Sequence, residues 1–239
     1  ESSASSGRLL WLLPLVAIGL FLGMIVVIGL RGRLGHTWPL CLLFIYVLCP
    51  WTSPVLAYGL LLAAVLLGVL LNCCPQRGIR WLPWGVFGVS LGLYLSTLAP
   101  GMLPADSGEF QFIGHVLGIA HPPGYALYTL LSKLITLLPI GSVAYRVNLF
   151  GAICGALTLA LLAGALQRST RSTSAALLAT VLLATSATFW AQSTTANIRT
   201  LTMLFVMLCI ALLLRWSEER SQRYLAAFAL CFGLGIGHH

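Results

Sequence analysis

Charged residues are scarce in this chain, and their scarcity decides its class. Asp, Glu, Lys and Arg make up 8% of the 239 residues, whereas about 25% is usual in a soluble domain. Hydrophobic residues make up 59%. So few charges do not keep a protein of this size in solution, which excludes a soluble enzyme, a secreted disulfide-bonded module and a disordered tail. The composition predicts an all-α polytopic membrane protein.

Acidic residues are the scarcest charged group, with five against thirteen Lys and Arg and a formal net charge of +8. The basic residues are scattered singly or in pairs between apolar runs, which is typical of membrane topology signals and predicts no nucleic-acid partner. Seven cysteines, an odd number mostly within apolar runs, predict no disulfide framework. Any carboxylate chemistry depends on Glu1, Asp106, Glu109, Glu218 and Glu219.

Seven apolar runs are candidates for membrane spans. Pro50 and Pro54 interrupt the second run, and because proline breaks a helix this run makes either one pass or two. The total is therefore seven or eight spans. Residues 1–80 form an N-terminal membrane module and residues 81–239 a second membrane domain. The runs are 9–30, 38–71, 81–98, 147–166, 175–189, 201–214 and 224–236.

Arginines between the runs predict which side of the membrane each loop faces. Short linkers carry Arg77 and Arg80, then Arg168 and Arg171, then a third group near residue 220. The positive-inside rule places all three linkers in the cytoplasm. Segment 99–145 then lies outside, together with residues 191–200 and the C-terminal end. We expect an integral protein of the bacterial inner membrane with this orientation.

The outer loop 99–145 is predicted to hold two interfacial helices. One begins at Asp106, because Asp at a helix N-cap with Glu109 three residues later is a capping pair. The other covers residues 125–138, where leucines recur at helical spacing around Lys133. Parity between the cytoplasmic linkers prevents this second helix from crossing the membrane.

No Asp, Glu, Lys or Arg falls deep within a predicted span, which disfavours an ion-coupled transporter. Ionisable side chains gather instead in the outer segments. His115 and His121 with the two loop acids make a conceivable divalent-metal set, but their spacing is not that of tight ligands, and we assign no metal site. The ionisable residues of the outer segments are Asp106, Glu109, His115, His121, Lys133, Arg146, Arg199, His238 and His239.

Several blocks in residues 81–239 resemble one protein family. They are Asp106-Ser107-Gly108-Glu109-Phe110, His121-Pro122-Pro123-Gly124-Tyr125-Ala126-Leu127-Tyr128, Arg146-Val147-Asn148-Leu149, Phe189-Trp190-Ala191-Gln192 and Gly235-Ile236-Gly237-His238-His239. Together they are similar to the transmembrane protein 260-like family of membrane glycosyltransferases, which includes a eukaryotic protein O-mannosyltransferase. The resemblance implies a glycosyltransferase-C fold, with interfacial helices in the first outer loop and a sugar donor carried on a polyprenyl phosphate.

The resemblance also implies roles for individual residues. Asp106 matches the usual catalytic acid of the first outer loop and is expected to take the proton from an acceptor hydroxyl. Glu109 assists it or only completes a helix cap. The expected partners of the donor and its phosphate are His121, Tyr125, Lys133, Arg146 and Asn148, although Arg146 could equally anchor its helix at the interface. No covalently bound cofactor is expected.

Two functions from different classes remain open. The first is sugar transfer to a protein or lipid hydroxyl on the outer face. The second is a catalytically silent relative that serves as an accessory transmembrane subunit of a respiratory or photosynthetic type of complex. It is suggested by Asn197-Ile198-Arg199, which stands where the family commonly has Glu-x-Tyr. That departure removes a carboxylate and adds a positive charge.

Overall fold

The computed structural model describes residues 80–238, and this part of the chain is helical without strands. Residues 1–79, with the predicted N-terminal module and its proline break, and His239 lie outside the described residues. The all-α prediction is confirmed for the described part. Its helices are α4 (Leu82–Ser96), α5 (Ala105–Val116), α6 (Ala126–Thr136), α7 (Val143–Thr170), α8 (Thr173–Ala184), α9 (Ala187–Ser193), α10 (Arg199–Glu219) and α11 (Gln222–His238).

Helices α7 and α10 are long and apolar enough to cross a membrane. Helices α8 and α9 add a third span if they are counted as one bent segment, with an angle of 71° between them. Helices α4 and α11, with 15 and 17 residues, are shorter. The protein is therefore an integral membrane protein, while the total of seven or eight spans stays a prediction.

The bend between α8 and α9 interrupts a run that the sequence predicts as one span, 175–189. The side chain of Thr185 donates a hydrogen bond to the carbonyl of Val181 at 2.8 Å, and that of Ser186 donates to Leu183 at 2.8 Å. Hydroxyls that bond back to the preceding turn compete with helix continuation and bend helices. The chain consequently leaves the axis of α8 before Ala187.

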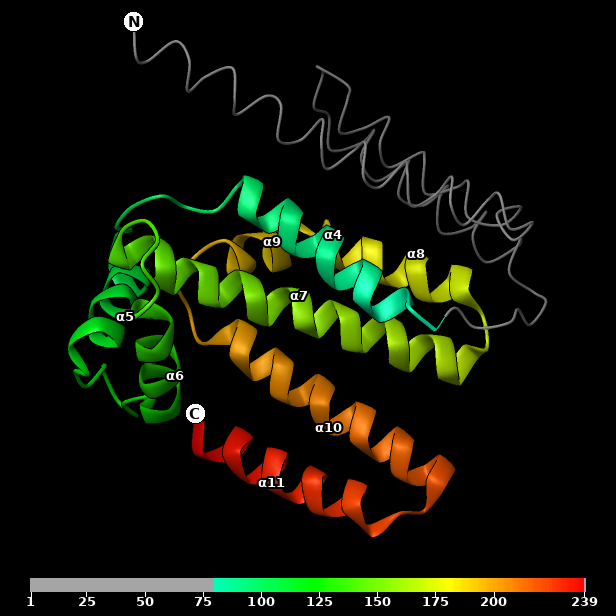
Figure 1. Cartoon of the computed structure of the whole chain (residues 1–239). Coiled ribbons are helices and arrows are strands. Elements are labelled where there is room, and N and C mark those ends of the chain that lie inside the picture. The colour runs from blue at the N-terminus through cyan, green and yellow to red at the C-terminus, as the bar shows by residue number, and fades with distance from the viewer. Residues whose placement is uncertain (1–79, 239) are drawn as a thin grey trace, which may run out of the picture.

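Helix α7 is the central element, with α4 and α8 along one side and α10 along another (Figure 1). Small residues allow this close packing. A Cβ atom at Gly155 would lie 2.4 Å from the Ser193 hydroxyl, and one at Gly151 would lie 2.8 Å from the carbonyl oxygen of Thr195. Helix α7 is thus held directly against the segment that joins α9 to α10.

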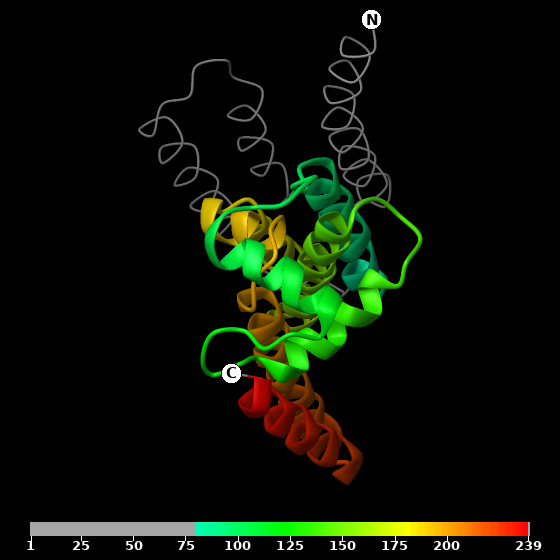
Figure 2. The same ribbon diagram turned by 90° about the vertical axis from the view of Figure 1, so that its left-hand side faces the viewer.

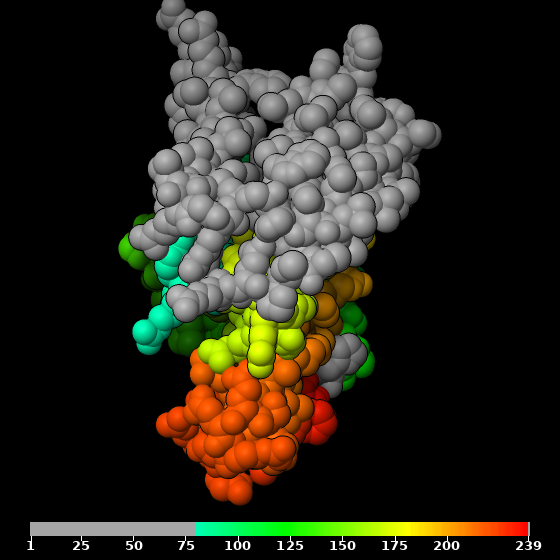
Figure 3. All heavy atoms as spheres, turned by 90° about the vertical axis from the view of Figure 1, so that its right-hand side faces the viewer, coloured from blue at the N-terminus to red at the C-terminus, as the bar shows by residue number. Residues whose placement is uncertain are grey.

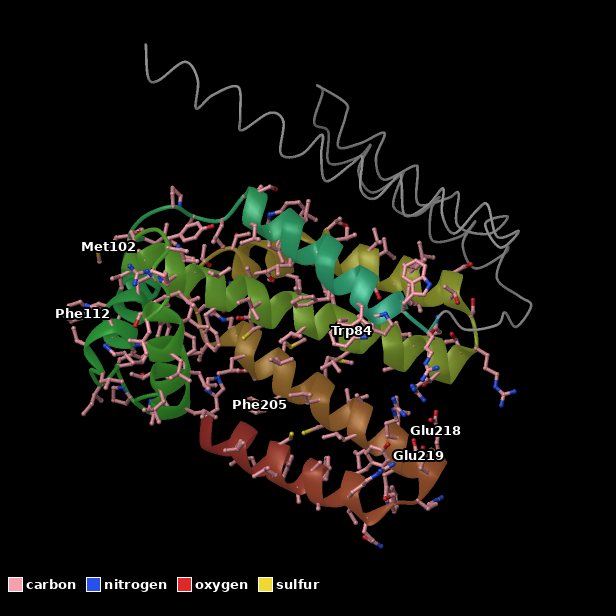
Figure 4. All side chains as sticks on the ribbon, viewed as in Figure 1. Trp84, Met102, Phe112, Phe205, Glu218 and Glu219 are labelled. Atoms are coloured by element: carbon pink, nitrogen blue, oxygen red, sulfur yellow. The ribbon has the colours of Figure 1, made fainter. Side chains whose placement is uncertain are left out.

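Within the described residues, the arginine-bearing linkers after α7 and after α10 share one end of the bundle, as the topology predicts. Arg168 after α7 forms a 2.9 Å ion pair with Glu218 at the end of α10. Figure 4 shows Glu218 and Glu219 at this end and Met102 and Phe112 at the opposite one. Figure 3, which views the arginine end, shows the turn after α7 beside the end of α10. The side of the membrane that each end faces stays a prediction.

At the opposite end, α5 and α6 lie across the bundle (Figure 2). Both helices were predicted for loop 99–145, and their existence is confirmed. In α6 the side chains of Thr129, Ser132 and Thr136 are buried, while Leu130, Leu134 and Leu137 are exposed. Leucines that face away from the protein are expected of a helix whose apolar face contacts lipid.

The predicted capping pair at the start of α5 is wrong. The N-cap position is occupied by Pro104, whose backbone is extended and whose side chain offers no hydrogen bond. Asp106 lies within the first turn instead. The Glu109 carboxylate, which a capping box would turn back to the N-cap, bonds to His121. Both acidic side chains are therefore available for roles other than capping.

Candidate active site

A cavity of about 710 Å³ lies where two predicted outer segments meet. Asp106, His121 and Tyr125 from the first segment line one side of it. The second segment contributes Gln192, Asn197, Arg199 and neighbouring residues. The size suits a small organic ligand, because ligand pockets are typically about 300–1,000 Å³. The cavity therefore brings together three of the predicted site residues and the segment that departs from the family pattern.

Each residue of the Asp106–Phe110 block has a distinct place. Asp106 is exposed on the cavity wall. Gly108 packs closely against the backbone of Leu103, since a Cβ atom at Gly108 would lie 2.3 Å from the Leu103 carbonyl oxygen. Phe110 is buried in the core between α5 and α6. This packing fixes the first turn of α5 and with it the position of Asp106.

Glu109 and His121 form a close pair beside the cavity. One carboxylate oxygen accepts a hydrogen bond from the His121 backbone N–H at 2.7 Å, and the other lies 2.7 Å from Nδ1 of the same residue. The hydrogen bond to the His121 ring holds the pKa of Glu109 below its ordinary value. The hydrogen bond that the His121 ring donates to the Glu109 carboxylate, together with the charges of Glu109 and Asp106, raises the pKa of His121.

A tight turn delivers His121 to this position. The backbone N–H of Gly124 donates to the His121 carbonyl at 3.0 Å, and Gly124 has a φ of +101°, which favours glycine. Around the imidazole lie the rings of Phe110 and Tyr125, with centroids 5.9 and 5.6 Å from its own. The Pro122-Pro123-Gly124 sequence thus sets the entry to α6, and the aromatic rings pack around the imidazole.

Asn148 does not line the cavity, and it connects α7 to the segment that precedes Asp106. Its side chain is fully buried and donates to the Ala99 carbonyl at 2.7 Å. It also accepts a 2.9 Å bond from Gln111, which in turn bonds to Gly101 and to the Leu103 N–H. Asn148 therefore positions residues 99–103, while Gln111 is a participant that the sequence reasoning missed.

The segment Asn197-Ile198-Arg199 also lines the cavity. The buried Asn197 side chain accepts hydrogen bonds from the Arg199 and Thr200 backbone N–H groups at 3.0 and 3.3 Å, which caps α10. Arg199 is exposed to the cavity and donates to the Gln192 side chain at 3.2 Å. His238, buried at the end of α11, lies 3.3 Å from the Ile198 carbonyl oxygen. Asn197 thus caps α10, and Arg199 places a positive charge in the cavity.

Two predicted phosphate partners do not line this cavity. Arg146 donates to the carbonyls of Thr136, Ile140 and Gly141, which terminates α6 and its following turn. Lys133 donates to the His115 carbonyl. Neither contact was visible in the sequence, because both acceptors are backbone groups brought close by the turn of the chain. Within residues 80–238 no three His, Cys, Asp or Glu side chains gather as a metal site.

A comparison with protein-family models matches residues 106–239 to the protein O-mannosyl-transferase TMEM260 N-terminal domain. The chain belongs to this family. The match begins at Asp106, so it contains every residue of the cavity described above. The resemblance seen in the sequence blocks is thereby confirmed, and the matched range includes Asn197-Ile198-Arg199.

Two curated relatives show the extent of the similarity. The mouse protein O-mannosyl-transferase TMEM260 is 42% identical over 139 residues, which is 58% of this chain and 20% of the relative. A Dictyostelium discoideum protein of the same name is 32% identical over 68 residues, 27% of this chain and 8% of that relative. The chain thus spans about a fifth of the mouse relative. No solved structure matches it.

Proposed function

We propose that the protein is a membrane glycosyltransferase that moves a sugar from a polyprenyl phosphate to a hydroxyl group on the outer face of the membrane. Kinship with proteins named as O-mannosyl-transferases supports mannose as the sugar and a protein hydroxyl as the acceptor. The observation that carries the proposal is a cavity lined by one carboxylate, Asp106, and by two basic side chains, His121 and Arg199.

In the proposed reaction Asp106 is the general base. The acceptor hydroxyl loses its proton to the Asp106 carboxylate as its oxygen bonds to the anomeric carbon of the sugar. The bond from that carbon to the phosphate oxygen breaks, and its electron pair leaves with the polyprenyl phosphate. A positioned base of this kind contributes roughly 10²- to 10⁴-fold to the rate.

Negative charge develops on the departing phosphate, and the cavity offers two groups to stabilise it. Arg199 carries a fixed positive charge and can bind phosphate oxygens through two parallel N–H groups. His121 contributes a second N–H donor. Donors already held near a developing charge stabilise a transition state because they need no reorganisation. Arg199 thereby takes the place that the sequence assigned to Lys133 and Arg146.

The test uses full-length protein in nanodiscs with a radiolabelled polyprenyl-phosphate mannose and a hydroxyl-bearing acceptor peptide. Wild-type protein is expected to release polyprenyl phosphate and to label the peptide. Asp106→Asn should retain donor binding and lose at least 10²-fold in rate, within the range of a removed general base. Glu218→Gln, which removes a carboxylate at the opposite end of the bundle, is the matched control and should leave the rate unchanged.

The accessory-subunit hypothesis rests on a different observation. Helices α10 and α11 expose large apolar side chains such as Val206, Ile210, Phe232 and Ile236, which suit either lipid or partner helices. Purification from native membranes separates the two functions. Recovery in a stoichiometric complex without sugar transfer would favour the accessory role, whereas turnover by the isolated protein supports the enzyme.

The cellular setting belongs to the same proposal. We place loop 99–145 on the outer side, because the arginine-bearing linkers after α7 and α10 lie together at the other end of the bundle. The bacterial inner membrane, expected from the sequence, gains no support from the two relatives, which come from mouse and Dictyostelium. Membrane lipids and the polyprenyl-phosphate sugar are the proposed partners.

A further inference from the structure

We infer that Glu109 is a positioning residue that orients the His121 imidazole and keeps it in the charged form in which it binds the departing phosphate. The inference rests on the proposed function, since it assigns Glu109 a role in the same cavity. It assigns different roles to the two acids of the Asp106–Phe110 block: Asp106 contacts the substrate, and Glu109 acts through the His121 side chain.

The geometry of the pair favours orientation over direct catalysis. Glu109 and His121 are 12 residues apart, and both carboxylate oxygens are engaged by the histidine, one by its backbone N–H and one by Nδ1. A carboxylate held by two bonds to one residue fixes both the main chain and the ring. Because Nδ1 faces Glu109, Nε2 is the ring nitrogen left to bind a ligand. Asp106 has no such bond to His121 and lines the cavity itself.

Charges around the ring also favour the imidazolium form. The hydrogen bond to the Glu109 carboxylate is the main cause of the raised pKa of His121, and the charges of Glu109 and Asp106 on α5 add to it. Arg199 at the start of α10 lines the same cavity and is the opposing cation. The remaining neighbours in ring contact, Phe110 and Tyr125, are aromatic. The two carboxylates outnumber the single guanidinium, so the net charge around His121 favours its protonated form.

A charged imidazole suits the proposed step better than a neutral one. A hydrogen bond from an ionised donor to a phosphate oxygen is roughly twice as strong as one between neutral groups. A neutral ring with the proton on Nδ1 would present a bare Nε2 lone pair to the phosphate, which repels it. Holding His121 protonated therefore sets both the sign of the charge and the presence of the donor.

The direct test is the titration of His121 by nitrogen NMR, with the imidazoles isotopically labelled and the protein in nanodiscs. Glu109→Gln should lower the pKa of His121 toward the ordinary value, because the side-chain shape is retained while the charge is lost. Glu109→Asp retains the charge and should keep the pKa raised. Glu219→Gln is the matched control, because Glu219 bonds to Arg215, Arg223 and Tyr224 and does not contact the cavity.

The second readout is the pH profile of sugar transfer. Activity requires protonated His121, so it falls as pH rises through the raised pKa of this residue. In Glu109→Gln this alkaline limb should move to lower pH, with a loss of about tenfold at neutral pH from replacing a charge-assisted bond by a weaker one. In a His121→Gln background, Glu109→Gln should cause no additional loss.

The outcomes separate the inference from the function on which it rests. Absence of transfer by wild-type protein would refute the proposed function, while the NMR titration would still decide whether Glu109 controls His121. An unchanged His121 titration in Glu109→Gln overturns the inference, whatever happens to the rate. So does a full additional loss of rate in the double variant, because Glu109 would then act independently of His121.

Discussion

Replacing Asn148 by Ala tests how the segment before Asp106 is held. The Asn148 side chain is fully buried and makes two bonds, to the Ala99 carbonyl at 2.7 Å and from Gln111 at 2.9 Å. Truncation removes both and leaves the Ala99 carbonyl without that donor. Each buried polar group that loses its partner costs about 1–3 kcal/mol. Gln111 keeps its bond to Gly101, so the expected loss in free energy of unfolding is about 2–4 kcal/mol in total.

The assay is equilibrium unfolding by SDS titration in mixed micelles, followed by the transfer rate under conditions where the variant stays folded. The rate should also fall, because residues 99–103 lead directly into α5 and fix Asp106. Thr158→Val is a matched control, since Thr158 is equally buried on α7 but its hydroxyl donates within the helix to Cys154. A loss below about 1 kcal/mol in Asn148→Ala, no more than a typical net hydrogen bond, would refute the reasoning.

A double-mutant cycle identifies the partner. Combining Asn148→Ala with Gln111→Ala should cost less than the sum of the single changes, because the bond between the two side chains is lost only once. Contacting residues typically show coupling of about 0.5–3 kcal/mol. Strict additivity would mean that Asn148 stabilises the fold through Ala99 alone.

Two further substitutions distinguish structural from ligand-binding roles. Gly108→Ala places a Cβ atom 2.3 Å from the Leu103 carbonyl oxygen, so the first turn of α5 must shift and the transfer rate should fall. Gly92→Ala is the control and should leave the transfer rate unchanged, because a Cβ atom there meets nothing within 4 Å. Arg146→Ala removes the side chain that bonds to three carbonyls at the end of α6 and should lower the free energy of unfolding. The Kd for the polyprenyl-phosphate sugar, measured by its binding to protein in nanodiscs, should not change. A higher Kd would mean that Arg146 binds the phosphate after all.

The sequence predicted the helices well where an apolar run alone decides them. The run 147–166 became the centre of α7, and the leucines of 125–138 placed α6. The break in 175–189 escaped notice because Thr185 and Ser186 are short polar residues whose effect depends on whether their hydroxyls turn back to the helix. Whether the hydroxyls bond back to the helix depends on local geometry, which a hydropathy pattern does not predict.

The candidate site was predicted mainly from the family resemblance of short sequence blocks. The chain has only five acids, and the resemblance, not this scarcity alone, assigned Asp106 and His121 to the site. The partners of Glu109, Lys133 and Arg146 could not be predicted, because each of these side chains bonds to groups at least five residues away that only the folded chain brings close. Arg199 counted against activity in the sequence, and only the folded structure shows that it lines the same cavity as Asp106.

The central claim is that Asp106 removes the acceptor proton in this cavity. Its most direct measurement is the single-turnover release of polyprenyl phosphate by Asp106→Asn with the donor already bound. The account predicts wild-type donor affinity with at least a 10²-fold slower release, as expected when a general base is lost. Release at the wild-type rate from a folded, donor-bound Asp106→Asn protein would contradict it.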